Sequence, residues 1–223
     1  MNRLSVNPIQ ETTLFDRYAI ESHNAGVLAD IYQDNVNIAI WKRSLRSNIL
    51  KAAERVLNAK QGFLFAASVT PKDTFDGLYN ALGANNDAEL ISADVTKMVD
   101  MFCCLFDLKQ AGLRLTALES AMCPRFHVDR VPCRLVTTYS EIATQWLAHQ
   151  DVDRSKLGTG NKGKSDEESG IYQSRDDINQ LSCGQVALLK GESWLGNVGG
   201  GLVHRSPSLG NSQKRLLLTL DFN

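Results

Sequence analysis

The stretch that decides the fold is residues 112–139, which read GLRLTALESAMCPRFHVDRVPCRLVTTY. Upstream of it, apolar residues recur with the period of a helix. From Leu113 onward they alternate with the two-residue period of a strand. The segment predicts three strands, at residues 113–117, 126–130 and 134–139. The chain therefore changes from helix to sheet near residue 111.

The region before this change, residues 1–110, is expected to be mainly helical. Helices fit residues 44–56, 72–82 and 93–108, and a short buried strand fits residues 62–69. The last helix has the clearest signal because one broad face is apolar. That face contains Val95, Met98, Val99, Phe102, Leu105 and Phe106.

The region after the change, residues 111–223, returns to strand patterns at residues 185–190, 201–204 and 215–222. Between them, residues 151–182 form a long polar loop of the kind that is often a mobile lid. About seven short strands suit a jelly roll of the cupin type. We therefore expect an α+β fold, with an N-terminal helical region packed on a C-terminal antiparallel double-stranded β-helix.

Composition excludes several classes of partner. The 223 residues carry a formal net charge of -1, which gives no electrostatic footprint for nucleic acid or an anionic membrane. The first 17 residues contain no apolar run, and no stretch approaches the roughly 18 apolar residues of a membrane helix. The five cysteines are odd in number and include no C-x-x-C pair. We expect a cytoplasmic protein that acts on a small molecule or another, unidentified substrate.

The chemistry-bearing pattern begins with His127 and Asp129, which would project from the same face of a strand. His204 lies on another expected strand, just before Pro207. Two imidazoles and one carboxylate suit a facial triad that holds ferrous iron and leaves half of its octahedral coordination sphere open. Zinc can use the same three ligands, with water in the fourth position.

A possible anion-binding group follows on the last strand. If that strand is regular, Arg215, Leu217 and Thr219 face the same way. A guanidinium and a hydroxyl could then bind a carboxylate inside the barrel. The alternative is an arginine in solvent at the strand end.

Two further features compete with this interpretation. Residues 158–165, GTGNKGKS, match the phosphate-binding expression G-x-x-x-x-G-K-[ST], with Lys164 and Ser165 in the functional positions. Their flanks do not resemble a buried strand and a helix, so a solvated loop is the alternative. Cys123 and Cys133 flank His127 and Asp129, and a thiolate ligand would favour zinc.

The sequence resembles the iron(II)/2-oxoglutarate-dependent dioxygenases. The resemblance rests on HVD at 127–129, VHRSP at 203–207 and RLLLTL at 215–220, within about residues 113–223. Residues 123–139 and 200–207 also resemble a bacterial family known only as a domain of unknown function.

The resemblance implies metal ligation by His127, Asp129 and His204. It also implies Arg215 as the counter-ion of 2-oxoglutarate, with Tyr139 or Thr219 as hydroxyl helpers. The expected function is an iron(II)-dependent oxygenase, with 2-oxoglutarate as co-substrate. The alternative is a non-catalytic zinc- or iron-binding protein of metal homeostasis.

Overall fold

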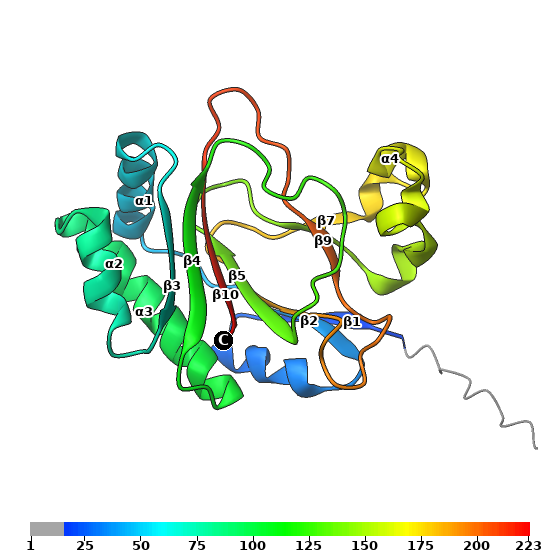
Figure 1. Cartoon of the computed structure of the whole chain (residues 1–223), viewed down its shortest axis with the longest axis horizontal. Coiled ribbons are helices and arrows are strands. Elements are labelled where there is room, and N and C mark those ends of the chain that lie inside the picture. The colour runs from blue at the N-terminus through cyan, green and yellow to red at the C-terminus, as the bar shows by residue number, and fades with distance from the viewer. Residues whose placement is uncertain (1–15) are drawn as a thin grey trace, which may run out of the picture.

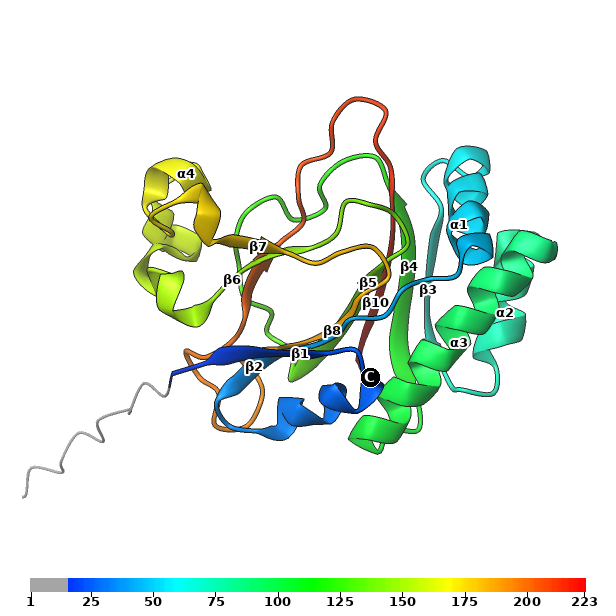
Figure 2. The same ribbon diagram turned by 180° about the vertical axis from the view of Figure 1, so that it is seen from behind.

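The computed structural model describes residues 16–223, which form two β-sheets with helices on the outside (Figures 1 and 2). The larger sheet has seven strands: β1 (Tyr18–Ser22), β2 (Val36–Trp41), β8 (Val186–Lys190), β5 (Cys133–Thr138), β10 (Arg215–Phe222), β4 (Ala111–Leu118) and β3 (Leu64–Val69), in that spatial order. The smaller sheet has the order β7 (Ile178–Gln180), β6 (Gln145–Leu147), β9 (Val203–Arg205).

Strand pairing is antiparallel throughout both sheets except between β1 and β2, which are parallel. The last strand, β10, lies between β4 and β5 and pairs with β4 from Arg215 opposite Leu118 to Phe222 opposite Ala111. Side chains alternate across the larger sheet, so each strand contributes to two separate cores.

One face of the larger sheet is covered by α1 (Ser47–Ala59), α2 (Thr74–Leu82) and α3 (Asn86–Phe106), as Figure 1 shows. The side chain of Asn85 accepts a hydrogen bond from the backbone N–H of Ala88. Asn85 is therefore the N-cap of α3, a position where asparagine is common. From there α3 buries a 3.6-period stripe against the sheet and the other two helices, with Val95, Met98, Val99 and Phe102 at its centre.

The opposite face of the larger sheet looks toward the smaller sheet. A second apolar cluster fills the space between them, with Ile40, Val136 and Leu217 from the larger sheet and Trp146 from the smaller one. The polar candidate residues lie beside this cluster, between the two sheets. The position of the site therefore follows from strand alternation.

Most expected elements lie near their expected positions, with differences that have physical reasons. β1 and β2 are absent from the sequence-based prediction, although β2 is almost entirely buried, as a central strand should be. Residues 126–130 do not form a strand, because only His127 makes a β-bridge there. The larger sheet combines β1, β2 and β3, which precede residue 110, with four strands that follow it.

No helix among residues 16–223 is long and apolar enough to cross a membrane.

The long polar segment at residues 151–182 is folded in the structure. It contains several single 3-10 turns, the short helix α4 (Asp166–Ser169) and strand β7. A capping box formed by Ser165 and Glu168 closes the start of α4. The expected long polar loop is thus a segment in which short helical turns and local caps satisfy part of the backbone.

Candidate metal centre

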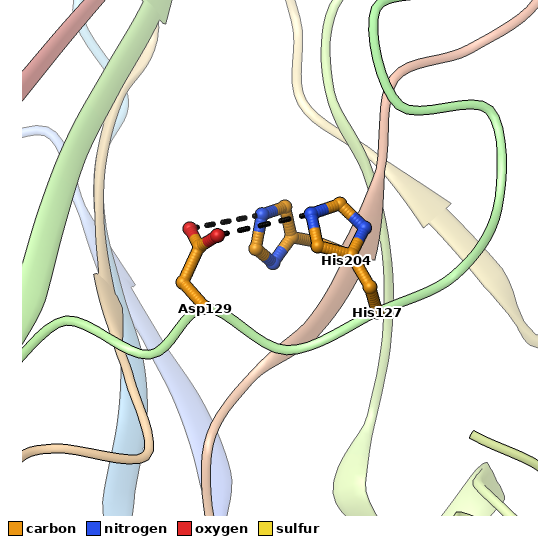
Figure 3. A group of neighbouring side chains, drawn as sticks. All are labelled: His127, Asp129 and His204. Carbon is orange, nitrogen blue, oxygen red and sulfur yellow. Dashed lines mark ion pairs between the residues drawn. The ribbon is translucent and has the colours of Figure 1, made fainter. Parts of the chain in front are cut away.

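His127, Asp129 and His204 converge on one point between the sheets (Figure 3). One ligand atom from each of the three residues lies within 4.8 Å of the others. The Nε2 atoms of His127 and His204 are 3.8 Å and 3.3 Å from the carboxylate oxygens of Asp129. Among residues 16–223 this is the one group of three or more such side chains close enough to hold a metal ion.

Backbone pairing places the two histidines side by side. His204 lies on β9, and His127 is bound to it by an isolated antiparallel bridge. The N–H of each histidine donates to the carbonyl oxygen of the other at 3.0 Å, and their ring centroids are 4.6 Å apart. Asp129 comes from the irregular segment that follows His127, and its carboxylate reaches the same side as the two imidazoles.

In both histidines the hydrogen bond to a backbone carbonyl uses Nδ1, which leaves Nε2 available to bind a cation. Nδ1 of His127 lies 2.9 Å from the carbonyl oxygen of Arg125, and Nδ1 of His204 lies 3.2 Å from that of Leu202. A carbonyl oxygen only accepts, so each Nδ1 carries the proton and each Nε2 presents a lone pair. Two lone pairs and a carboxylate then face one another, an arrangement that a metal cation stabilises.

The electrostatics keep Asp129 ionised. Burial alone would raise its pKa, but its interactions with the side chain of His204 and with the charge of Arg134 lower the pKa of Asp129 to about 2. Arg134 donates to Oδ2 of Asp129 at 2.7 Å and also forks onto both carboxylate oxygens of Asp221. Burial and the neighbouring His204 lower the pKa of His127, which favours the neutral imidazole that a metal requires.

Arg215 lies in the same cavity as His127 and His204 and is 1% exposed. Its guanidinium donates to three hydroxyls: Thr144 at 2.6 Å, Ser206 at 3.0 Å and Thr138 at 3.2 Å. Within residues 16–223 no carboxylate lies within ion-pair distance of it. Burial without such a partner lowers the pKa of Arg215 to about 10.

The two expected hydroxyl helpers have different positions. Thr219 lines the cavity with Arg215, as the alternation along β10 predicts. Tyr139 does not reach the cavity, because it belongs to the opposite face of β5 and packs in the helix-covered core. Its hydroxyl donates to Asp94 at 2.7 Å instead. Thr138, one residue earlier, supplies the hydroxyl at the cavity.

The competing features do not form sites. Cys133 is fully buried in the helix-side core, and burial raises the pKa of its thiol. Cys123 lines the cavity but does not belong to the group of converging ligands. In the GTGNKGKS segment Ser165 caps α4, a helix of four residues, and 3-10 turns take the place of the buried strand that a phosphate-binding loop follows.

The sequence analysis missed the polar residues that support this site. Alternation along β5 would have placed Arg134 and Thr138 on the cavity face, and Ser206 follows His204 by two residues. Thr144 follows no strand pattern, so its contact with Arg215 had no signal in the sequence. The contact between Arg134 and Asp129 also depends on a turn whose shape the sequence does not specify.

Comparison with known proteins places the fold. No curated protein sequence matches the chain. A dioxygenase for auxin oxidation in rice is similar at a TM-score of 0.53 and 12% identity, over 92% of this chain and 82% of that chain. Dioxygenase for auxin oxidation 1 from Arabidopsis thaliana, solved in complex with 2-oxoglutarate, is similar at a TM-score of 0.50 and 8% identity, over 92% of this chain and 91% of that chain. At such identities the likeness establishes a shared fold alone. Residues 22–221 match the family described as "Protein of unknown function (DUF1826)", and the chain belongs to that family.

Proposed function

We propose that the protein is an iron(II)-dependent oxygenase that uses 2-oxoglutarate as co-substrate. The observation that carries the proposal is the buried Arg215, which shares a cavity with His127 and His204 but has only hydroxyl partners. A buried cation without a counter-charge is costly unless an anion binds it. A dicarboxylate with one end at the metal and the other at Arg215 satisfies both groups.

The residues around Arg215 suit a carboxylate. Each hydroxyl of Thr138, Thr144 and Ser206 accepts from the guanidinium and keeps its own proton to donate. The guanidinium is held by these contacts, so little side-chain entropy is lost when an anion binds. We also propose that the two sheets form the double-stranded β-helix, or jelly roll, in which such a pocket lies between the sheets.

The metal ligands have matching roles. His204 is the buried ligand, with 8% of its side chain exposed, and His127 is the accessible one, with 33% exposed. Bound ferrous iron would supply the activation of dioxygen. The chain itself holds the co-substrate through Arg215 and keeps Asp129 ionised through Arg134. Met122 and Cys123 line the open side of the cavity beside His127, where we propose that the small-molecule substrate enters.

Metal storage is the weaker proposal. A storage or structural zinc site is closed by four protein ligands, whereas the group here has three within residues 16–223. A storage site also has no use for the buried Arg215. We further propose a cytoplasmic location, which suits the five free cysteines.

Anaerobic titration tests the proposal. Metal-free protein is titrated with ferrous iron and then with 2-oxoglutarate, and the weak visible charge-transfer band of keto-acid chelation is recorded. We expect the band in the wild type and in His23→Ala, an exposed control, and expect its loss in His204→Ala. Iron binding without a band would refute the use of 2-oxoglutarate, and tight zinc binding with no room for a further ligand would favour metal storage.

A further inference from the structure

The segment at residues 151–182 packs against the outer side of the two histidine-bearing segments. Phe126 and Val203, which immediately precede His127 and His204, are buried in a small apolar cluster with Ile171 and Tyr172 of this segment. The phenyl ring of Phe126 meets the ring of Tyr172 edge to face, with 5.9 Å between centroids. The segment therefore packs against the residues that immediately precede both histidines.

One carboxylate in this segment binds both histidine-bearing segments. Asp166, 6% exposed, accepts the backbone N–H of Phe126 at 2.9 Å and the Nη1 of Arg205 at 3.0 Å, both at Oδ2. Phe126 is the residue before His127, and Arg205 is the residue after His204. The same oxygen thus bridges the chain on either side of the histidine pair.

The other contacts of Asp166 fix its direction. Its Oδ1 accepts from Nε of Arg125 at 3.1 Å, and it occupies the first position of α4, whose start is closed by the capping box. Arg205 is held in turn by Gln145 of β6, which accepts its Nε at 2.8 Å, and its guanidinium lies 4.3 Å from the ring centroid of Phe126. Arg205, which Asp166 binds, is therefore itself anchored.

We propose that Asp166 is a positioning residue of the metal centre, an inference that rests on the proposed function. By holding Phe126 and Arg205 with one oxygen, it sets the spacing of the backbone bridge between His127 and His204, and so the spacing of their Nε2 atoms. Polar contacts behind metal ligands change metal affinity because they orient the ligands. The segment at residues 151–182 is then a rigid support rather than a lid.

The test compares Asp166→Asn with Glu167→Gln in the full chain. Glu167 is the adjacent residue, and its exposed ion pair with Arg175 touches neither histidine segment. The probe is Co²⁺, whose dissociation constant and visible ligand-field spectrum report the geometry of the ligands. We expect Asp166→Asn to raise the dissociation constant about 10- to 100-fold and to change the spectrum. Glu167→Gln should match the wild type.

A purely structural role gives a different result. It would lower the melting temperature of Asp166→Asn but leave the Co²⁺ constant and spectrum unchanged well below that temperature, which would overturn the inference. If Asp166→Asn does not fold, Arg205→Lys gives the same comparison, because lysine keeps the charge but cannot bond both Asp166 and Gln145 in the same way.

Measuring Co²⁺ binding and the response to 2-oxoglutarate in the wild type distinguishes a failure of this inference from a failure of the proposed function. Co²⁺ binding that depends on Asp166, with no response to 2-oxoglutarate, would support the positioning role while refuting the oxygenase. An absence of Co²⁺ binding by the wild type would overturn both.

Discussion

His127 and His204, far apart in the sequence, exchange both of their backbone hydrogen bonds at 3.0 Å. This reciprocal bridge fixes the separation of the two backbone segments, from which the imidazoles reach a centroid distance of 4.6 Å. Asp129 is added by a turn two residues further on. A metal centre built on a bridge between two segments is sensitive to anything that moves either segment, and this sensitivity underlies the predictions that follow.

Replacing Arg215 should separate stability from ligand binding. We expect Arg215→Met to leave the melting temperature of the metal-free protein unchanged or higher, because the variant removes a buried charge that has only hydroxyl partners. The same variant should lose the stabilisation that 2-oxoglutarate gives the iron-loaded wild type, about 2.7 kcal/mol at 100 times the dissociation constant. Thermal unfolding with and without the ligand measures both effects.

The control for this variant is Arg114→Met. Arg114 is exposed on the neighbouring strand β4, opposite Thr219. The iron-loaded Arg114→Met variant should still be stabilised by 2-oxoglutarate as the wild type is. A fall in the melting temperature of metal-free Arg215→Met as large as that of a core cavity variant would show that Arg215 is a structural residue, which contradicts the role given to it.

Gly191 should be required for the position of Asp129. A Cβ at Gly191 would lie 2.0 Å from the carbonyl oxygen of Val131 and 2.9 Å from that of Asp129. Gly191→Ala must therefore push the turn that carries the metal carboxylate. We expect it to destabilise the protein by about 1–3 kcal/mol, the usual cost of overpacking, and to weaken Co²⁺ binding. Chemical denaturation and metal titration measure the two effects.

A glycine in an open helix position provides the matched comparison. Gly77 lies in the exposed part of α2, and the nearest atom to its added Cβ is 3.7 Å away in the ring of Phe65. Gly77→Ala should stabilise the protein by about 0.5–1 kcal/mol through helix propensity, with no change in metal binding. Equal effects of the two substitutions would contradict the steric argument.

The ionisation of Asp129 should appear in the acid stability of the metal-free protein. Its pKa in the folded chain is about 2, below the ordinary value of 3.8, so the unfolded chain binds more protons between these values. The contribution, about 2 kcal/mol, is complete above pH 4 and is lost as the pH falls through 2. The destabilisation caused by Asp129→Asn should therefore be large at pH 5 and disappear near pH 2.

Denaturation of both proteins in a chelating buffer measures this difference across the pH range. A gap between wild type and Asp129→Asn that stays constant down to pH 2 would show that Asp129 is not held as a carboxylate by His204 and Arg134. The role of Asp129 as a ready metal ligand at neutral pH would then lose its support.

The sequence predicted the three residues that converge better than the residues around them. Periodicity located the helices and most strands, whereas His127 and Asp129 reach the same side without the strand on which their two-residue spacing was interpreted. Tyr139 was named from the resemblance alone, and it lies in the helix-covered core rather than at the cavity. No local pattern could show that Asp166, in a polar segment with loop composition, binds the residues next to both histidines. Such contacts are long-range in sequence and emerge only from the packed fold.

The thiols should make no contribution to metal binding. Cys123 lies at the cavity but outside the converging ligand set, and Cys133 faces the helix-side core on the other side of β5. We expect Cys123→Ser and Cys133→Ala to keep the Co²⁺ affinity and spectrum of the wild type, without the intense charge-transfer absorption that a thiolate ligand gives. His204→Ala, in which a ligand is removed, is the positive control and should lose binding. A thiolate band that disappears in Cys123→Ser would mean that the loop carrying Cys123 moves to ligate the ion, and a closed zinc site would then replace the open iron site as the better explanation of the centre.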